Sequence, residues 1–127
     1  MRAVILVGLG GAFGALARFW GGIVLTQRLG AAFPYATLVI NITGCLVLGL
    51  VGTLAVERPA LVTNDLRLLV GVGFCGAYTT FSTFGFETVS LLRAGDVSAA
   101  LLYVLGSNAL GLLAVALGFY LARAIPW

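Results

Sequence analysis

Charge and histidine are scarce in this sequence. Charged residues make up 9% of the 127 residues, and the chain contains no histidine. A soluble domain carries charge on about a quarter of its residues, so the composition excludes an ordinary soluble domain. The absence of histidine excludes imidazole ligands to a metal and acid–base catalysis by an imidazole. Because 61% of the residues are hydrophobic, the chain is predicted to be an integral membrane protein that forms one membrane domain over residues 1–127.

Cysteine is also rare, and the basic residues are dispersed. Cys45 and Cys75 lie in apolar segments without a CxxC spacing, so they indicate neither a metal site nor a disulfide framework. We interpret them as small hydrophobic packing residues. All seven basic residues are arginines scattered along the chain, so the net charge of +3 does not indicate a nucleic-acid partner. With no plausible catalytic triad or metal cluster, the sequence predicts that the protein is not an enzyme.

Four long apolar runs dominate what is present. A helix needs about 20 apolar residues to cross the hydrocarbon core of a bilayer. The chain has four runs of this kind, and we predict transmembrane helices at about residues 3–27, 34–56, 66–92 and 97–122. The predicted fold is therefore an all-α membrane protein with four transmembrane helices per chain.

The first run permits a second reading. Arg2 precedes an apolar stretch that ends in Ala15-Leu16-Ala17, which resembles the cleavage site of a signal peptide. Gly10 and Gly14 instead form a GxxxG pair, which suits close packing against another helix. We therefore favour a retained transmembrane helix whose glycine face meets a neighbour.

The third run has an unusual centre, from Gly73 to Phe86. Four hydroxyl side chains and four phenyl rings fall within this stretch. Gly76 weakens a helix, and the hydroxyls that follow can bond to backbone carbonyls in place of helical bonds. Non-helical backbone at membrane depth persists only where it is buried in protein or lines a wet path. The stretch predicts a broken third helix, and the alternative is a tightly packed helix crossing.

No run has a carboxylate near its middle. The acidic residues all lie toward the ends of runs or in connections: Glu57, Asp65, Glu87 and Asp96. A proton-coupled exporter of this size needs an acid inside the membrane to carry the proton. A small proton-coupled secondary transporter of the dual-topology type is therefore the disfavoured alternative, and a narrow hydrogen-bonding path for a small ion fits better. Glu87 keeps two readings, a partner of an interfacial arginine or a group that faces a vestibule.

The arginines divide almost evenly between the two sides of the membrane. With the N-terminus inside, four arginines would lie inside and two or three outside. The positive-inside rule needs a clearer bias to select one orientation. Insertion both ways is thus permitted, and four helices are too few to enclose a path and shield it from lipid. These two points predict an antiparallel, dual-topology homodimer.

Polar side chains occur at helical spacing in the second and fourth runs. Thr37 and Asn41 share one helix face, and Tyr103 and Ser107 share another. Each pair either links neighbouring helices by hydrogen bonds or lines a polar path. Arg18, in the first run, is either an interfacial anchor or a positive charge that attracts anions into a vestibule.

Two phenyl rings of the third run also share a face, because Phe81 and Phe84 lie three residues apart. A phenyl ring has a negative face and a positive edge. Rings presented edge-on would favour an anion, and rings presented face-on would favour a cation. The sequence leaves both open, together with a simple packing role.

Three motifs, in this order, resemble those of the Fluc (CrcB-type) fluoride channels. They are GGAFGALARF at Gly10–Phe19, TLVINITG at Thr37–Gly44, and GFCG followed by TTFSTF within Gly73–Phe84. The resemblance covers the whole chain in length, number of helices and motif order. It implies a passive, fluoride-selective channel that exports fluoride across the bacterial plasma (inner) membrane, as a multi-pass protein embedded in lipid.

The resemblance also implies an assembly and roles for individual residues. The channel would be an antiparallel homodimer with two fluoride pathways. The residues lining each pathway would be Asn41, Phe81, Phe84, Thr37, Tyr103 and Ser107. Backbone carbonyls of Gly76 and Thr79 from both subunits would hold a structural sodium ion, and Arg18 would lie at the vestibule. One departure is Gly111, at a position where the family often has a further hydroxyl residue lining the pathway. That part of the pathway therefore lacks a side-chain donor here.

Overall fold

The computed structural model of the protein describes residues 1–126, and all regular structure within them is helical. The elements are α1 (Arg2–Leu29), α2 (Tyr35–Glu57), α3 (Asn64–Leu66), the π-helical η1 (Arg67–Cys75), α4 (Gly76–Tyr78), α5 (Phe81–Arg93) and α6 (Val97–Ala124). Four stretches are long and apolar enough to cross a membrane: α1, α2, the run from α3 to α5, and α6. The prediction of an all-helical chain with four long apolar segments is confirmed.

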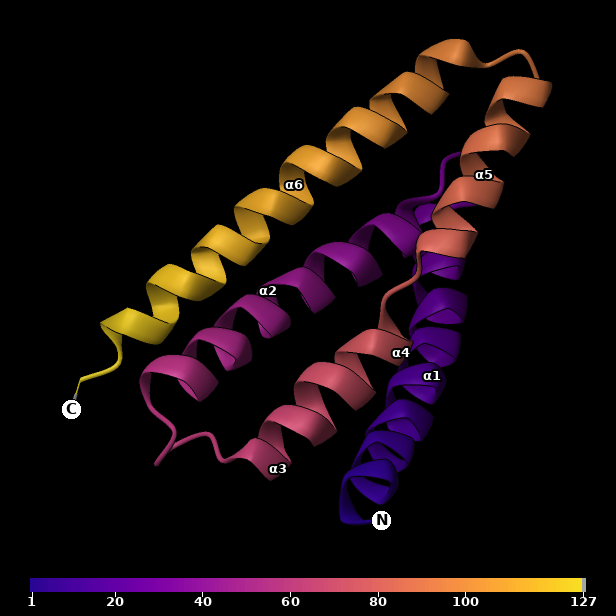
Figure 1. The fold of residues 1–127 in the computed structure, drawn as a ribbon. Helices are drawn as coiled ribbons and strands as arrows, with labels where there is room; N and C mark the ends of the chain where they lie inside the picture. Colours follow the sequence, from indigo (N-terminus) through magenta and orange to yellow (C-terminus); the bar gives the residue numbers. More distant parts are fainter. Residues whose placement is uncertain (127) are drawn as a thin grey trace.

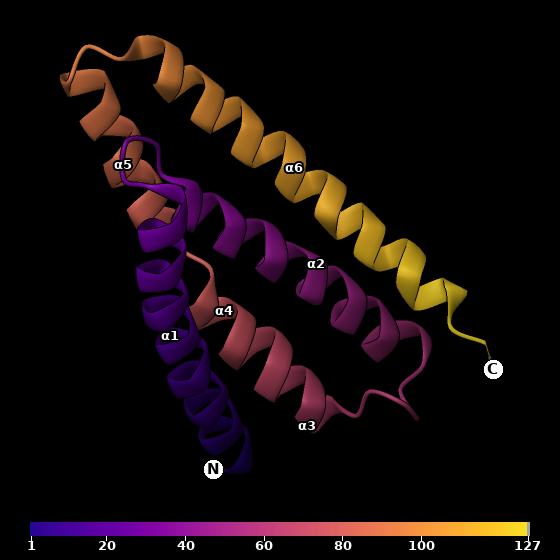
Figure 2. The same cartoon turned by 180° about the vertical axis from the view of Figure 1, so that it is seen from behind.

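The first long segment pairs with the third, and the second pairs with the fourth (Figures 1 and 2). The first half of the third segment, η1 and α4, packs along α1, and α6 packs along α2. The chain therefore rises through α1, descends through α2, rises again through α3 to α5, and descends through α6. Between α4 and α5 the path bends, and α5 leads away from α1 to the start of α6. The bend therefore lies beside α2, which α6 also packs against.

Glycines set how closely the paired segments approach. A β-carbon at Gly10 or Gly14 would collide with the backbone carbonyl of Leu69 or Phe74, respectively. The glycine face of α1 therefore meets the third segment, as its GxxxG pair predicted. Between α2 and α6, a β-carbon at Gly118 would lie 2.6 Å from the Leu46 carbonyl oxygen. Both contacts bring backbone against backbone.

Contacts made by arginines join the helix ends at the end of the molecule that holds both chain termini. Arg2 pairs with Asp65 and so joins the start of α1 to α3. Arg123 Nη2 lies 2.6 Å from Glu57 Oε1, which joins the ends of α6 and α2. The buried Arg58 donates from Nη1 to the Ile125 carbonyl at 2.6 Å. Exposed ion pairs contribute little stability, about 0–1 kcal/mol each, so these contacts mainly fix how the helix ends are arranged.

Candidate functional site

The site is built around a two-residue interruption between α4 and α5. Thr79 (φ −80°, ψ 159°) and Thr80 (φ −149°, ψ 119°) are extended. The Thr79 hydroxyl donates to the Cys75 carbonyl at 2.9 Å. The Thr80 hydroxyl oxygen accepts from the Thr83 backbone N–H at 3.1 Å and so caps the first turn of α5. The hydroxyl run of the sequence thus supplies the local bonds that end one helix and start the next.

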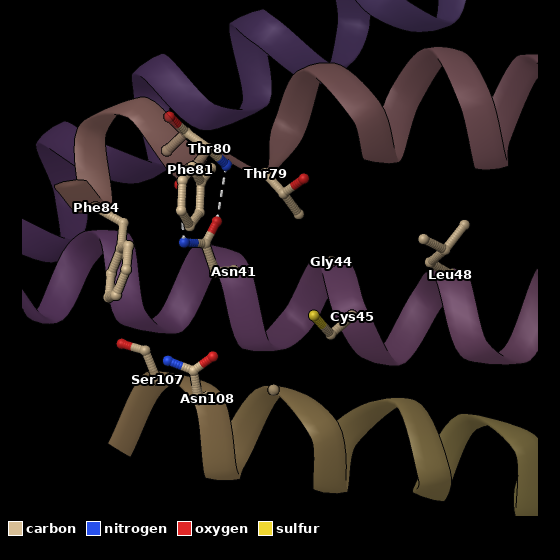
Figure 3. A pocket seen from close by; sticks show the side chains of 11 residues that line it. Asn41, Gly44, Cys45, Leu48, Thr79, Thr80, Phe81, Phe84, Ser107 and Asn108 are labelled. Atoms are coloured by element: carbon tan, nitrogen blue, oxygen red, sulfur yellow. Dashed lines mark hydrogen bonds between the residues drawn. The ribbon is translucent and has the colours of Figure 1, made fainter. Parts of the chain in front are cut away.

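Asn41 of α2 bonds to both backbone groups of Thr80 (Figure 3). The Thr80 N–H donates to Asn41 Oδ1 at 2.8 Å, and Asn41 Nδ2 donates to the Thr80 carbonyl at 3.1 Å. Thr80 is 7% exposed. A buried backbone group without a partner is costly, and the two bonds remove that cost for this residue.

A cavity of about 280 Å³ lies between this interruption, α2 and α6. It brings together four of the six residues predicted for the fluoride pathway: Asn41, Phe81, Phe84 and Ser107. Its remaining wall consists of Gly44, Cys45, Leu48, Thr79, Thr80, Asn108 and Gly111. The Ser107 hydroxyl oxygen is buried and has no hydrogen-bond partner among the residues described. Such an atom calls for an explanation, and a ligand in the cavity would provide one.

The two predicted pore phenyls differ in exposure. Phe81 is 84% exposed, whereas Phe84 is half-buried and lies 5.1 Å from the Tyr103 ring between centroids. The Phe81 and Phe84 rings are 5.7 Å apart and inclined by 37°. The Phe81 ring is therefore largely uncovered by the rest of this chain.

The other two predicted pathway residues meet at a carboxylate. Thr37 donates its hydroxyl to Glu87 Oε1 at 2.9 Å, and Tyr103 donates its hydroxyl to Glu87 Oε2 at 2.7 Å. Thr37 and Tyr103 are buried, at 6% and 1% exposure. Hydrogen bonds to a carboxylate are short and strong. Glu87 thus holds two hydroxyls in place one helical turn beyond Phe84.

Sequence reasoning left Glu87 out of the candidate site. It grouped this residue with acids near segment ends, but α5 starts anew at Phe81, so Glu87 lies well within the helix. Its spacing of three residues from Phe84 was a usable signal, since such residues share a helix face. Glu87 also lines a second cavity, of about 360 Å³, beside the α1–α2 connection and α5.

Arg18 and the predicted cation ligands lie near the interruption. Arg18 Nη1 is 3.4 Å from the Thr79 carbonyl oxygen, so the guanidinium faces the backbone at the break. Gly76 is exposed, and a β-carbon there would have nothing within 4 Å. Within residues 1–126, no cluster of three or more cysteine, aspartate or glutamate side chains could hold a metal. A cation at this place would depend on backbone carbonyls.

Comparison with known proteins identifies the family. The family model described as "CrcB-like protein, Camphor Resistance (CrcB)" matches residues 5–119. A relative from Trichormus variabilis is 46% identical over 97% of this chain and 90% of its own length. A relative from Synechocystis sp. is 47% identical over 98% of this chain and 95% of its own. A third, from Thermus thermophilus, is 42% identical over 98% of both chains.

All three relatives carry the name "Fluoride-specific ion channel FluC". They are named as channels, which agrees with the prediction that this chain is not an enzyme. The match extends over nearly the whole chain and includes every residue of the cavity wall. This multi-pass integral protein of the bacterial inner membrane therefore belongs to the CrcB-like family.

Proposed function

We propose that the protein is a passive, fluoride-selective ion channel that exports fluoride and so lowers its toxicity in the cytoplasm. The observation that carries this proposal is the cavity that joins the Asn41 amide, the free Ser107 hydroxyl and two phenyl rings. Fluoride is small and strongly hydrated, so donors must replace its water along the route. The names of the relatives agree with this choice of ion.

The contacts suggest the course of the pathway. It would run from the cavity at Asn41 and Ser107, past Phe84 and Tyr103, to the second cavity beside Glu87. The hydroxyls of Thr37 and Tyr103 already donate to Glu87. They can serve fluoride only when the carboxylate turns away. Glu87 would therefore control the passage at this level.

We further propose that the working unit is an antiparallel homodimer of dual topology, surrounded by membrane lipid. The exposed Phe81 ring and the open space beside Gly76 favour a second copy as the covering partner. The interruption of the third transmembrane helix frees the carbonyls around Gly76 and Thr79. Two copies could offer four such oxygens to a hard cation such as sodium. Arg18 would add positive charge close to the vestibule.

A flux assay tests the proposed function. Purified protein in liposomes should release fluoride rapidly, measured with a fluoride electrode, while chloride stays trapped. Release should continue when the proton gradient is abolished, because no proton-coupled step is involved. Phe81→Ile and Asn41→Asp should each abolish flux while the dimer still assembles. Absence of fluoride release from inserted, dimeric protein would refute the proposal.

A further inference from the structure

Thr80, like Thr79, has an extended backbone at the break between α4 and α5. Because Thr79 and Thr80 are both extended, the Thr80 N–H has no helical carbonyl to bond to, and the Thr80 carbonyl lies at the N-cap of α5. The residue is buried and lies in a membrane-spanning segment. Without another partner the Thr80 N–H would be left unpaired, which is unfavourable in a membrane. The interruption persists only if another part of the protein bonds to this group.

Asn41 provides both bonds from one side chain. Its Oδ1 accepts from the Thr80 N–H at 2.8 Å and its Nδ2 donates to the Thr80 carbonyl at 3.1 Å. We propose that Asn41 is the positioning residue of the helix break, which holds Thr80 extended and thereby sets where the Thr79 carbonyl and the Phe81 ring lie. This inference rests on the proposed function only in calling the break part of an ion pathway.

An amide is the side chain that this geometry requires. It carries a donor and an acceptor on one rigid plane, in the arrangement that pairs with an extended peptide. An aspartate at this position keeps the acceptor but, when ionised, has no donor for the Thr80 carbonyl and repels it. A protonated aspartate regains a donor. Asn41→Asp should therefore form both hydrogen bonds with Thr80 only at low pH.

Titratable groups on the elements that meet near the break enter the design of the test. They are Arg18 on α1, Cys45 on α2, Cys75 in η1, Tyr78 in α4, Glu87 in α5 and Tyr103 in α6. Glu87 is the one carboxyl group among them, so its effect must be separated from that of an introduced aspartate. The pH series is therefore repeated in a Glu87→Gln background.

The test follows hydrogen exchange of the peptide that contains Thr79, Thr80 and Phe81 in the full-length dimer. Asn41→Ala should raise its exchange, corrected for intrinsic rate, by about tenfold or more, because both bonds are lost. Asn41→Asp should raise exchange at about pH 8 and approach the wild-type value at about pH 5. Asn108→Ala is the matched control, since this amide lines the same cavity but donates to Val104 in its own helix.

The outcomes separate this inference from the proposed function. Wild-type exchange in Asn41→Ala would overturn the positioning role, even if that variant lost all fluoride flux, because Asn41 would then act on the ion alone. Should Asn41→Ala fail to assemble, the pH series in Asn41→Asp decides, and a pH-independent exchange would overturn the inference. The exchange result stands whether or not the wild type conducts fluoride.

Discussion

Gly111 offers the sharpest test of where ions pass. It lines the cavity on α6, one helical turn beyond Ser107. A β-carbon at Gly111 would meet only the Cys45 sulfur, at 3.6 Å, which is ordinary van der Waals contact. Alanine therefore fits without strain. Because alanine is favoured over glycine in a helix by about 1 kcal/mol, Gly111→Ala should raise stability by up to that amount.

Larger side chains at this position should separate stability from flux. Gly111→Ser adds a hydroxyl in line with Ser107, so we expect fluoride flux at or above the wild-type rate. Gly111→Leu places an apolar side chain into a cavity of about 280 Å³ and should reduce flux strongly. The stability of the leucine variant should stay close to that of the alanine variant, because the side chain enters open space.

The same two helices offer a control. A β-carbon at Gly49 would lie 2.5 Å from the Val115 carbonyl oxygen, in the tight contact between α2 and α6. Gly49→Ala should therefore cost about 1–3 kcal/mol through overpacking. Thermal unfolding in detergent and fluoride efflux from liposomes would measure both effects. A stable, dimeric Gly111→Leu protein with wild-type flux would show that the cavity is not the pathway.

Two further predictions concern acidic residues. Glu87→Gln keeps the shape but replaces two charge-assisted hydrogen bonds by neutral ones, at a cost on the order of 1–3 kcal/mol in thermal unfolding. Glu57→Gln removes the charge of an exposed ion pair and should change stability little. Equal losses of stability in the two variants would contradict the stabilising role of the two hydrogen bonds to Glu87. At the start of α6, the Ala99 N–H and the Ser98 hydroxyl lower the pKa of Asp96. The stability from this cap is present above the unfolded-state pKa and lost as pH falls through the folded value. Wild type and Asp96→Ala should therefore differ in melting temperature at neutral pH and converge in acid, and a constant difference would count against the capping role.

The long helices could be predicted from the sequence because one physical requirement dominates them. Backbone polar groups in a bilayer must bond within their own segment, so an uncharged run of sufficient length becomes a helix. The close approach of α1 to another helix could likewise be predicted, since the pair Gly10 and Gly14 lets two backbones meet, but the sequence did not identify the third segment as the partner. The π-helical geometry of η1 has no comparable pattern in the sequence. Gly71 and Gly73 of η1 are buried against neighbours that only the fold supplies.

Within the candidate site, the types of residue present were easier to predict than their hydrogen-bond partners. The hydroxyls and phenyls at Thr79 to Phe84 stood out because polar groups at membrane depth need a reason. The bond from Thr37 to Glu87 joins residues 50 positions apart, and no local spacing encodes it. The roles assigned to the pathway residues remain predictions that the flux assays address.

The two hydrogen-bond sets of the site have different physical consequences. Asn41 bonds to the N–H and the carbonyl of a buried backbone residue, so its contact resists change and suits a fixed support. Thr37 and Tyr103 instead bond to a side chain that can rotate, so their hydroxyls can be released. A pathway for a strongly hydrated anion needs both properties, because its shape must persist while its donors become free in turn. The structure places the fixed contact at the break and the releasable contact beyond Phe84. Substitutions at Asn41 should therefore alter the architecture of the break, whereas substitutions at Glu87 should change the rate of passage.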